Sequence, residues 1–353
     1  MRAYFRVLTA MIADFLGGVA TTLLILRISL PEELGIYSRI LSLALLGSSI
    51  ALLGIDVLIR IYLPRGERVN DLIGFALISL AIFSIALIPI ELYSSILAFL
   101  SGAYLLQISR YLALRDYTGY LKIVLARRLP QPIIVPLAFY YYGPEAAALA
   151  IAITYLPSIK IIKHASLGIP RGLSDVIYTF LSRLLSALTI YLDKVLIALL
   201  YGYLALGVYY FVRQVNMILT LPIVAFDRFG VQEISAGKRI EREFLLSLLI
   251  VTASAVLVRL FRGYTRVLFP NYAPYAYLLR ATIPFAIFRG LAAYEKAKAL
   301  GGKELKLPAI AQAVAMIIAI TTIILSRGSL EILVSAQYLA QLGYRITLKI
   351  TYR

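Results

Sequence analysis

The sequence predicts an all-α integral membrane protein with about 12 transmembrane helices. Two observations carry this prediction. First, 61% of the 353 residues are apolar, only 15% are charged, and the mean hydropathy is +0.87. A soluble domain averages about 45–50% apolar and about 25% charged residues, so this chain has too little polar surface for a water-soluble particle. Second, apolar runs of roughly 20 residues, the length that crosses a bilayer, follow one another along the chain.

The expected helices are separated by short polar or proline-containing segments. Pro89 and Glu91 mark the break between the third and fourth helices. The fifth contains three prolines, which either kink it statically or let it bend during function. The expected spans are 8–28, 36–59, 70–89, 91–109, 119–141, 144–162, 174–198, 203–226, 243–260, 274–294, 307–325 and 329–348. The first is too long for a signal peptide, so we expect it to remain as a helix.

The distribution of basic residues predicts the orientation. Cytoplasmic loops carry excess Lys and Arg. With the N-terminus inside, 22 of the 35 basic residues fall in inside segments and five in outside segments, three of those five between 259 and 266. We therefore expect both termini in the cytoplasm. The formal charge of +17 then reflects topology and anionic headgroups, which removes the reason to expect nucleic-acid binding.

Composition also excludes several chemistries. The chain has no cysteine and a single histidine, His164, which we expect at the surface. Disulfides and thiolate chemistry are therefore excluded, and no metal site is expected. No loop exceeds about 16 residues and no paired-carboxylate or phosphate-binding motif is present, so no catalytic residues and no enzyme activity are expected.

An internal repeat predicts two bundles. Leu34-Gly35-Ile36-Tyr37 opens the second expected helix, and Leu206-Gly207-Val208-Tyr209 opens the eighth, 172 residues later. Two repeats of the same orientation imply a pseudo-two-fold axis along the membrane normal and a central cavity between the halves. We expect an N-terminal six-helix bundle at 1–162, a cytoplasmic linker at 163–173 and a C-terminal six-helix bundle at 174–353.

Several short motifs resemble the polysaccharide (O-antigen type) flippases of the multidrug/oligosaccharidyl-lipid/polysaccharide exporter superfamily. They span nearly the whole chain, although each is degenerate, and many members have two helices more. The motifs are residues 27–37 (RISLPEELGIY), the LLGID run ending at Asp56, YLDK at 191–194 with Gly202 and LGVY at 206–209, PNYA at 270–273, and ALGGK at 299–303. The resemblance implies a multi-pass transporter that works by alternating access.

Eight basic residues fall inside the expected helices. An Arg at a helix centre costs roughly 2.5–3.5 kcal/mol on insertion scales, so these side chains cannot all face lipid. Lys194 and Arg289 can reach headgroups by snorkelling, whereas Arg183 and Arg213 lie near the middle of their helices. Each could instead bind a backbone carbonyl or one carboxylate. The predicted cationic cavity comprises Arg39, Arg127, Arg128, Arg183, Lys194, Arg213, Arg280 and Arg289.

We expect only four acids in the membrane, Asp14, Asp56, Asp193 and Asp227, which leaves at least four basic groups without an acidic partner. We expect gating or coupling roles for these acids. Asp14 is a candidate coupling-ion or proton site, or a helix-to-helix hydrogen bond. Asp56 and Arg60 are four residues apart and predict an ion pair. Asp193 predicts a structural or gating pair with Lys194.

A cationic cavity indicates an anionic cargo, because guanidinium groups match phosphate oxygens bidentately. The leading hypothesis is a cell-membrane transporter that flips a polyprenyl-(di)phosphate-linked oligosaccharide to the outer leaflet for glycan biosynthesis. Glycosyltransferases of the pathway are expected partners, no cofactor is expected, and Na⁺ or H⁺ is a candidate coupling ion. The alternative is a drug or metabolite cation antiporter of the same fold, which favours acids in the cavity. Tyrosines among the 26 either stack on sugar or form the interfacial belt.

Overall fold

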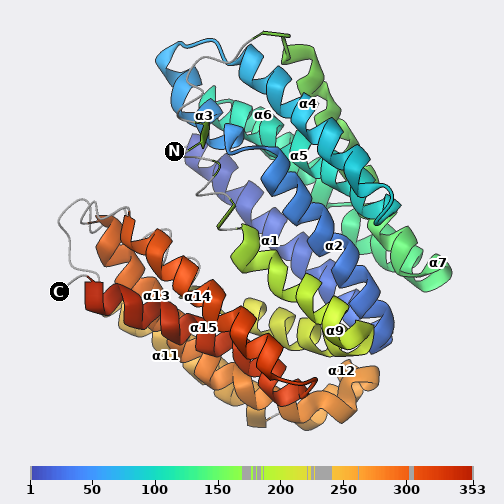
Figure 1. Cartoon of the computed structure of the whole chain (residues 1–353), viewed down its shortest axis with the longest axis vertical. Coiled ribbons are helices and arrows are strands. Elements are labelled where there is room, and N and C mark those ends of the chain that lie inside the picture. The colour runs from blue at the N-terminus through green and yellow to red at the C-terminus, as the bar shows by residue number, and fades with distance from the viewer. Residues whose placement is uncertain are drawn as a thin grey trace. The chain divides into compact units, whose positions relative to one another are not determined.

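The computed structural model describes residues 2–168, 176–177, 180, 184–185, 187–220, 222–223, 226, 241–260, 262–301 and 306–351 (Figure 1). Over these ranges the secondary structure is helical and includes no strand, which confirms the all-α prediction. Contacts between Cα atoms divide the chain into two compact units. Unit 1 comprises Met1–Ser29 and Ile36–Val195, and unit 2 comprises Leu30–Gly35 and Leu196–Arg353. The predicted six-helix bundles at 1–162 and 174–353 stay a prediction.

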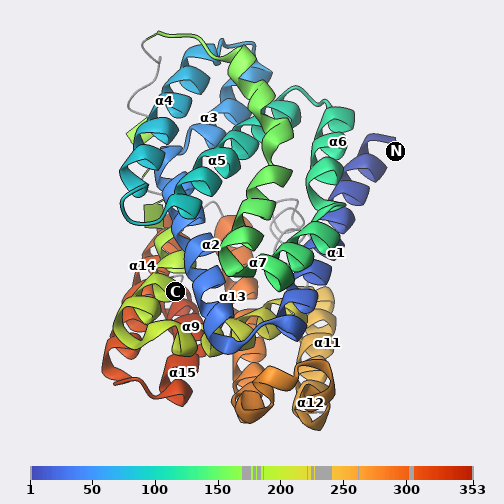
Figure 2. The same ribbon diagram turned by 90° about the vertical axis from the view of Figure 1, so that its right-hand side faces the viewer.

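Unit 1 is built around a long, largely buried helix, α5. It contacts α3, α4, α6, α7 and η2, while α1 lies along α6 and α7 (Figure 2). One apolar core joins α3, α4 and α5 through fully buried side chains such as Ile59, Ile73 and Leu106. The elements are α1 (Arg2–Ile28), α2 (Pro31–Ala51), α3 (Ile55–Tyr62), η1 (Leu63–Arg65), α4 (Asn70–Leu87), α5 (Leu92–Ala113), α6 (Tyr117–Arg128), α7 (Gln131–Thr154), η2 (Leu156–His164) and η3 (Leu188–Leu192).

In unit 2, α15 lies against α13 and α14, and α11 lies against α13. Small side chains make these contacts close: Ala292, Ala311 and Ala315 are buried in one cluster. The elements are α9 (Asp193–Leu219), α11 (Glu241–Leu260), η4 (Arg262–Tyr264), α12 (Thr265–Leu268), η5 (Pro270–Ala281), α13 (Thr282–Gly301), α14 (Lys306–Leu325) and α15 (Leu330–Thr351). The first three residues of α9 belong to unit 1, and the first five residues of α2 belong to unit 2.

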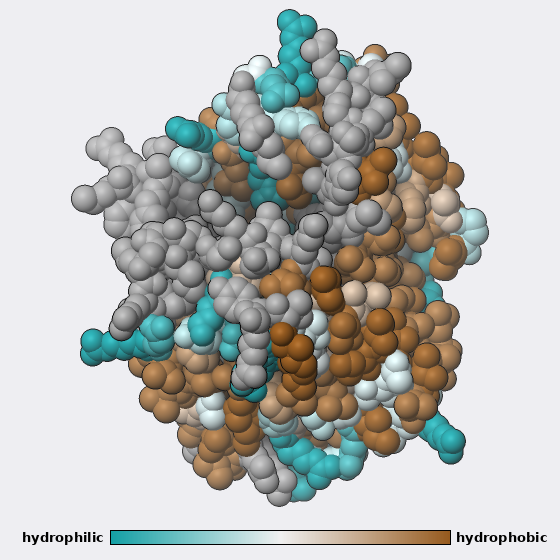
Figure 3. All heavy atoms as spheres, turned by 60° about the vertical axis from the view of Figure 1, so that its left-hand side comes forward, coloured by the Kyte–Doolittle hydropathy of each residue, from teal (hydrophilic) through white to brown (hydrophobic). Residues whose placement is uncertain are grey.

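Apolar side chains cover much of the described surface in Figure 3. Six described helical segments are long and apolar enough to cross a membrane, as a multi-pass membrane protein requires. They are Pro31–Ala51, Asn70–Leu87, Leu92–Ala113, Tyr117–Thr154, Asp193–Leu219 and Pro270–Ala299. The expected total of 12 stays a prediction. The residues that face outward include Ile82, Ile85 and Leu249, each more than 60% exposed, as expected for side chains that contact lipid.

Glycines decide several helix boundaries. Gly143, with φ 84°, and Gly202, with φ 82°, interrupt α7 and α9 in a backbone conformation that L side chains rarely adopt. These two positions confirm the predicted breaks at 141/144 and 198/203. The predicted helix at 36–59 is wrong as a continuous element: α2 ends at Ala51, Leu53 and Gly54 have positive φ, and α3 begins at Ile55.

The two repeats contact each other inside unit 2, where Leu30–Gly35 lies beside α9. A Cβ added to Gly35 would overlap the carbonyl oxygen of Tyr203, and one added to Gly207 would overlap the carbonyl oxygen of Pro31. The two contacts are reciprocal, since each glycine meets the residue four positions before the other glycine. This reciprocal contact supports the prediction that the two LG-Tyr motifs are equivalent in the fold.

Candidate functional site

A break in the helix that follows α5 positions two arginines. The apolar segment from Tyr117 to Thr154 is long enough to span a membrane, yet α6 ends at Arg128 and α7 begins at Gln131. Pro130 lies in the gap and lacks the N–H that a continuing helix would need. The predicted helix at 119–141 is therefore two helices. Arg127 and Arg128 occupy the last turn of α6, where positive charge complements the helix dipole.

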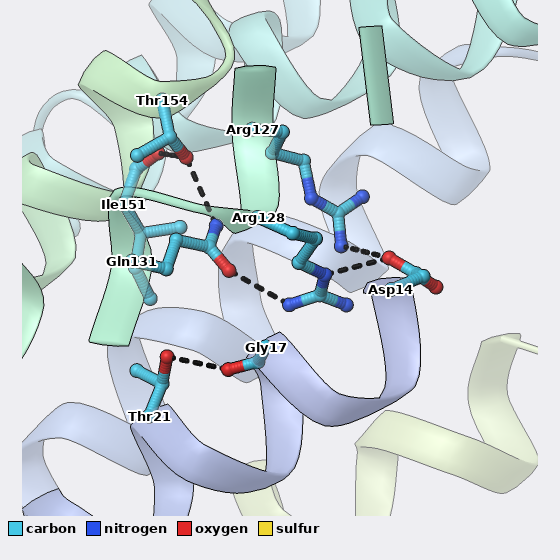
Figure 4. Close-up of polar contacts among 8 residues, drawn as sticks. All are labelled: Asp14, Gly17, Thr21, Arg127, Arg128, Gln131, Ile151 and Thr154. Atoms are coloured by element: carbon cyan, nitrogen blue, oxygen red, sulfur yellow. Dashed lines mark hydrogen bonds and ion pairs between the residues drawn. The ribbon is translucent and has the colours of Figure 1, made fainter. Parts of the chain in front are cut away.

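Both arginines bind one carboxylate on α1. The Asp14 Oδ1 atom accepts from Arg127 Nη2 at 3.0 Å and from Arg128 Nε at 2.6 Å (Figure 4). The Arg127 side chain is 10% exposed and that of Arg128 is 22% exposed, whereas Asp14 is 45% exposed. The sequence placed Asp14 and the arginine pair 113 residues apart, and the fold brings them into direct contact.

A polar chain continues from Arg128 into α7. Arg128 Nη1 donates to the Gln131 side-chain oxygen at 2.8 Å, and the Gln131 amide donates to Thr154 Oγ1 at 2.9 Å. Thr154 in turn donates to the Ile151 carbonyl oxygen. Gln131 and Thr154 are both buried, and each hydrogen bond satisfies a polar group that burial would otherwise penalise. The chain therefore fixes the orientation of the Arg128 guanidinium (Figure 4).

Arg127 is held between two aromatic rings. Its guanidinium carbon lies 4.5 Å from the centroid of Tyr104 and 5.0 Å from that of Tyr155, and the two rings meet edge to face. Such cation–π contacts stabilise a cation that is withdrawn from water. The buried Nε atom of Arg127 has no hydrogen-bond partner. The Nε–H group of Arg127 therefore remains able to donate a hydrogen bond to a ligand.

Two glycines on α1 leave room for Arg128. A Cβ added to Gly17 would lie 3.0 Å from the Arg128 carbonyl oxygen, and one added to Gly18 would lie 3.3 Å from Arg128 Nη1. A larger residue at Gly17 would push against the α6 backbone, and one at Gly18 would displace the Arg128 guanidinium. Thr21 Oγ1 donates to the Gly17 carbonyl oxygen at 2.7 Å, which keeps this turn of α1 intact.

We name Asp14, Arg127, Arg128 and Gln131 the arginine cluster. Two guanidinium groups share one carboxylate, so these four side chains carry one net positive charge. A buried charge is costly unless it is paired. An anionic ligand group therefore complements the cluster, and guanidinium groups match phosphate oxygens in geometry as well as charge.

Three other basic side chains, Arg39, Arg60 and Arg280, also have acidic partners. Arg39 on α2 forms a salt bridge with Glu91, and Arg280 on η5 forms one with Glu331 at 2.7 Å. Arg60 Nη2 lies 3.5 Å from Asp56 Oδ2, which confirms the predicted i, i+4 pair. The predicted number of acids in the membrane is too low, because Glu91 and Glu331, each near the start of a predicted helix, were left out of it. Among the helix cations that the structure describes, an acid lies within 4.0 Å of Arg39, Arg127, Arg128, Lys194 and Arg280, with Asp14 used twice.

Lys194 does not snorkel as predicted. It is 5% exposed, its Nζ atom lies 3.8 Å from Asp193 Oδ1, and the ammonium lies 4.9 Å from the centroid of the Tyr191 ring. Asp193 is also buried and accepts from the Lys194 backbone N–H. These contacts fit the predicted structural pair. The preceding residues 188–192 form a π-helical turn, a feature often found at functional sites.

Arg213 and Arg289 each contact a neutral polar side chain. Arg213 Nη1 lies 3.4 Å from Tyr209 Oη, and Arg289 Nη1 lies 3.4 Å from the Gln341 side-chain oxygen, both within unit 2. Arg183 and Asp227 lie outside the described residues. Within the described ranges, no group of three or more His, Asp or Glu side chains could hold a metal ion.

Sequence reasoning missed the neutral members of the site. Gln131 lies three residues after Arg128, a spacing that predicts side-chain contact along a helix, but the prolines on both sides of it obscured this signal. Tyr104 and Tyr155 carried no local signal, because tyrosine is common in this chain and their contact with Arg127 depends on tertiary structure.

Comparison with solved structures supports the fold. No protein-family profile and no curated protein matches the sequence. A multidrug resistance MATE family transporter of the MOP superfamily in an inward-facing conformation is 15% identical, with a TM-score of 0.68 over 99% of this chain and 98% of that chain. The lipid II flippase MurJ in an inward closed conformation is 13% identical, with a TM-score of 0.70 over 99% of this chain and 87% of that one.

A third match is a MOP superfamily transporter from Pyrococcus furiosus, described as having a binding pocket of reversed polarity that suggests a different function. It is 14% identical, with a TM-score of 0.58 over 99% of this chain and 93% of that chain. At these identities the comparison shows the fold alone. The chain thus has the fold of MOP superfamily transporters, and the matching structures are those of transporters, not enzymes.

Proposed function

We propose that this protein is a membrane transporter that flips a polyprenyl-(di)phosphate-linked oligosaccharide from the cytoplasmic to the outer leaflet. The arginine cluster carries the proposal. Its two guanidinium groups outnumber their carboxylate within a segment long enough to span the membrane, and Arg127 keeps an unused buried donor. A phosphate would supply the missing negative charge and the missing acceptor.

The discontinuous helix supports the same proposal. Transporters commonly place substrate sites where a membrane helix is broken, because the freed backbone and the helix ends can contact the cargo. Here the break at Leu129–Pro130 places Arg127 and Arg128 at the end of a half-helix. The phosphate of the cargo would bind there, the sugar would stay in water and the polyprenyl tail would stay in lipid.

The proposal also includes the bundles, the cavity residues, the partners and the acidic residues that were predicted from the sequence. The six-helix bundles would alternate in exposing a central cavity to each side of the cell membrane, with both termini cytoplasmic. Lys194, Arg39, Arg183, Arg213, Arg280 and Arg289 would contribute to the cationic cavity. Glycosyltransferases of the same pathway would supply and consume the cargo, and no cofactor would be needed. Asp14, Asp56, Asp193 and Asp227 would serve gating or coupling.

A drug or metabolite cation antiporter is the second candidate. Two observations favour it: the fold is shared with MATE transporters, and Asp14 is 45% exposed, so Na⁺ or H⁺ could reach its carboxylate. Against it stands the charge of the arginine cluster. A cationic drug would meet two arginines for each carboxylate, and their repulsion would oppose its binding.

Reconstitution in liposomes tests the proposal. We would follow a fluorescent polyprenyl-diphosphate sugar as it becomes accessible to an external quencher, with and without Na⁺ and H⁺ gradients. The expected result is protein-dependent movement that Arg127→Gln and Arg128→Gln reduce by about tenfold or more, the effect of losing one charged hydrogen bond. Lys349→Gln, which removes an exposed positive charge near the end of α15, is the matched control.

Two outcomes would contradict the proposal. If the lipid does not move but an ion gradient drives uptake of a small organic cation, the antiporter is the better assignment. If Arg127→Gln and Arg128→Gln both move the lipid at the wild-type rate, the arginine cluster does not bind the phosphate. Size-exclusion chromatography of each variant shows whether a lost rate reflects lost folding.

A further inference from the structure

Unit 2 contains a cavity that shares no residue with the arginine cluster. It has a volume of about 300 Å³ and lies between η5, the start of α13 and the first turns of α15. Apolar side chains such as Leu278 and Val334 are buried beneath it, and the Tyr338 ring forms part of its wall. Its size falls at the small end of the range for ligand pockets, which suits a ligand of one ring rather than a lipid tail.

The Arg280–Glu331 salt bridge also lines this cavity. Arg280 Nη2 lies 2.7 Å from Glu331 Oε2, and both side chains are about half exposed, at 55% and 52%. This contact uses one N–H of the guanidinium fork and one oxygen of the carboxylate. The pair as a whole is neutral, so it presents further donors and acceptors side by side without a net charge.

An aromatic ring beside these charged groups favours a carbohydrate. A sugar ring has vicinal hydroxyl groups, each of which can donate and accept, and C–H faces that stack on aromatic rings. The Arg280–Glu331 pair can satisfy the hydroxyls while remaining paired, and Tyr338 offers the stacking surface. A lone anion or cation would be attracted by one member of the pair and repelled by the other, so the neutral pair favours an uncharged ligand.

We propose that this cavity is a monosaccharide subsite, contacted by Arg280, Glu331 and Tyr338, which holds one sugar unit of the cargo. This inference rests on the proposed function, because it assigns the glycan of the lipid-linked cargo to unit 2. On the predicted orientation, Glu331 follows an outside loop, so the subsite lies toward the outer surface, where the glycan is released.

The absence of tryptophan from the sequence makes a direct test possible. Tyr338→Trp introduces a single tryptophan into the wall of the cavity, and its fluorescence is titrated with a neutral hexose, an N-acetylhexosamine and a deoxyhexose. We expect a saturable change with at least one sugar. Glu331→Gln or Arg280→Gln in the same background should weaken binding by about tenfold or more, as a lost charged hydrogen bond does.

Tyr142→Trp is the control reporter, because Tyr142 lies in unit 1 and is 80% exposed; its fluorescence should not respond. Saturation-transfer NMR on the unmodified protein repeats the titration without the Tyr338 change. The inference is overturned if no sugar gives a saturable response in either experiment, or if Glu331→Gln and Arg280→Gln leave the affinity unchanged. Lipid movement that depends on Arg127 while no sugar binds would overturn the subsite alone and leave the proposed function standing.

Discussion

At the scale of single residues, the arginine cluster depends on one carboxylate that serves two cations. Asp14 Oδ1 is the acceptor for both Arg127 and Arg128, so removal of its charge would leave two guanidinium groups facing each other. Removal of Arg127 would instead leave a neutral Asp14–Arg128 pair. The two substitutions therefore have opposite consequences for the local charge, although each breaks the same ion pair.

Asp14→Asn should lower the free energy of unfolding by about 1–3 kcal/mol, because two buried cations lose their counter-charge. Adding Arg127→Gln to Asp14→Asn should recover part of this loss, because one of the two cations is gone. Thermal unfolding of the two single variants and the double variant in detergent measures the coupling. Strictly additive changes in melting temperature would show that Asp14 and Arg127 do not interact.

His164 at the end of η2 should have a pKa below its usual value of about 6.5. Partial burial lowers the pKa of its imidazole, and the positive charges of Arg110 and Lys163 lower it further. Because the unfolded chain then binds the proton more readily, this group should destabilise the protein as the pH falls through 6.5.

NMR titration of histidine-labelled protein checks the His164 pKa, because this is the only histidine in the sequence. Arg110→Gln should move its pKa upward, since it removes one of the repelling charges. A pKa at or above 6.5 in the unmodified protein would contradict the expected order of effects.

At the scale of elements, close glycine contacts connect the two repeats. Gly35 and Gly207 each face a carbonyl oxygen of the opposite repeat, and Tyr272 closes the same region from η5. The Tyr272 ring stacks on Phe211 at 4.7 Å, and its hydroxyl donates to the Leu30 carbonyl oxygen. In lipid, helix contacts rely on close van der Waals approach, which small residues allow.

Gly207→Ala should lower the free energy of unfolding by about 1–3 kcal/mol, because its methyl group would overlap the Pro31 carbonyl oxygen and force the backbones apart. Gly263→Ala is the matched control: a Cβ there meets no atom within 4 Å. Melting temperatures in detergent compare the two variants. Equal stability of Gly207→Ala and the unmodified protein would mean that the contact is not close in solution.

Local sequence signals predicted some of the helix boundaries and missed others. The breaks at 141/144 and 198/203 were predicted from where the apolar runs end, and the structure places Gly143 and Gly202 there with positive φ. The break at Leu53–Gly54 was missed because the apolar run continues unbroken across it. The gap at Leu129–Pro130 was predicted only as a kink, since a proline alone does not determine whether a helix bends or ends.

At the scale of the whole molecule, the charge distribution predicts which loops face the cytoplasm. Basic residues gather in alternate loops, and the absence of cysteine makes their location easy to measure with introduced thiols. Two positions suit this purpose. Tyr142, in the predicted outside loop, is 80% exposed, and Leu167, in the predicted cytoplasmic linker, is 88% exposed.

Tyr142→Cys should react with a membrane-impermeant maleimide added to intact cells, whereas Leu167→Cys should react only after the membrane is permeabilised. The physical reason is the preference of Lys- and Arg-rich loops for the cytoplasmic side. The cysteine-free parent protein is the control for labelling of other proteins. The opposite labelling pattern would invert the predicted orientation and with it the side on which the cavity beside Glu331 opens.

The sequence alone determined that this is a helical membrane protein with an internal repeat and basic residues inside its apolar segments. Hydropathy and a repeated motif can both be read directly from the order of the residues. Only the tertiary structure decided which charges on different helices meet. Asp14 and Arg127 are 113 residues apart, and Arg39 pairs with Glu91 across 52. Such pairs depend on which helix faces contact each other, and residue composition carries no information about that choice.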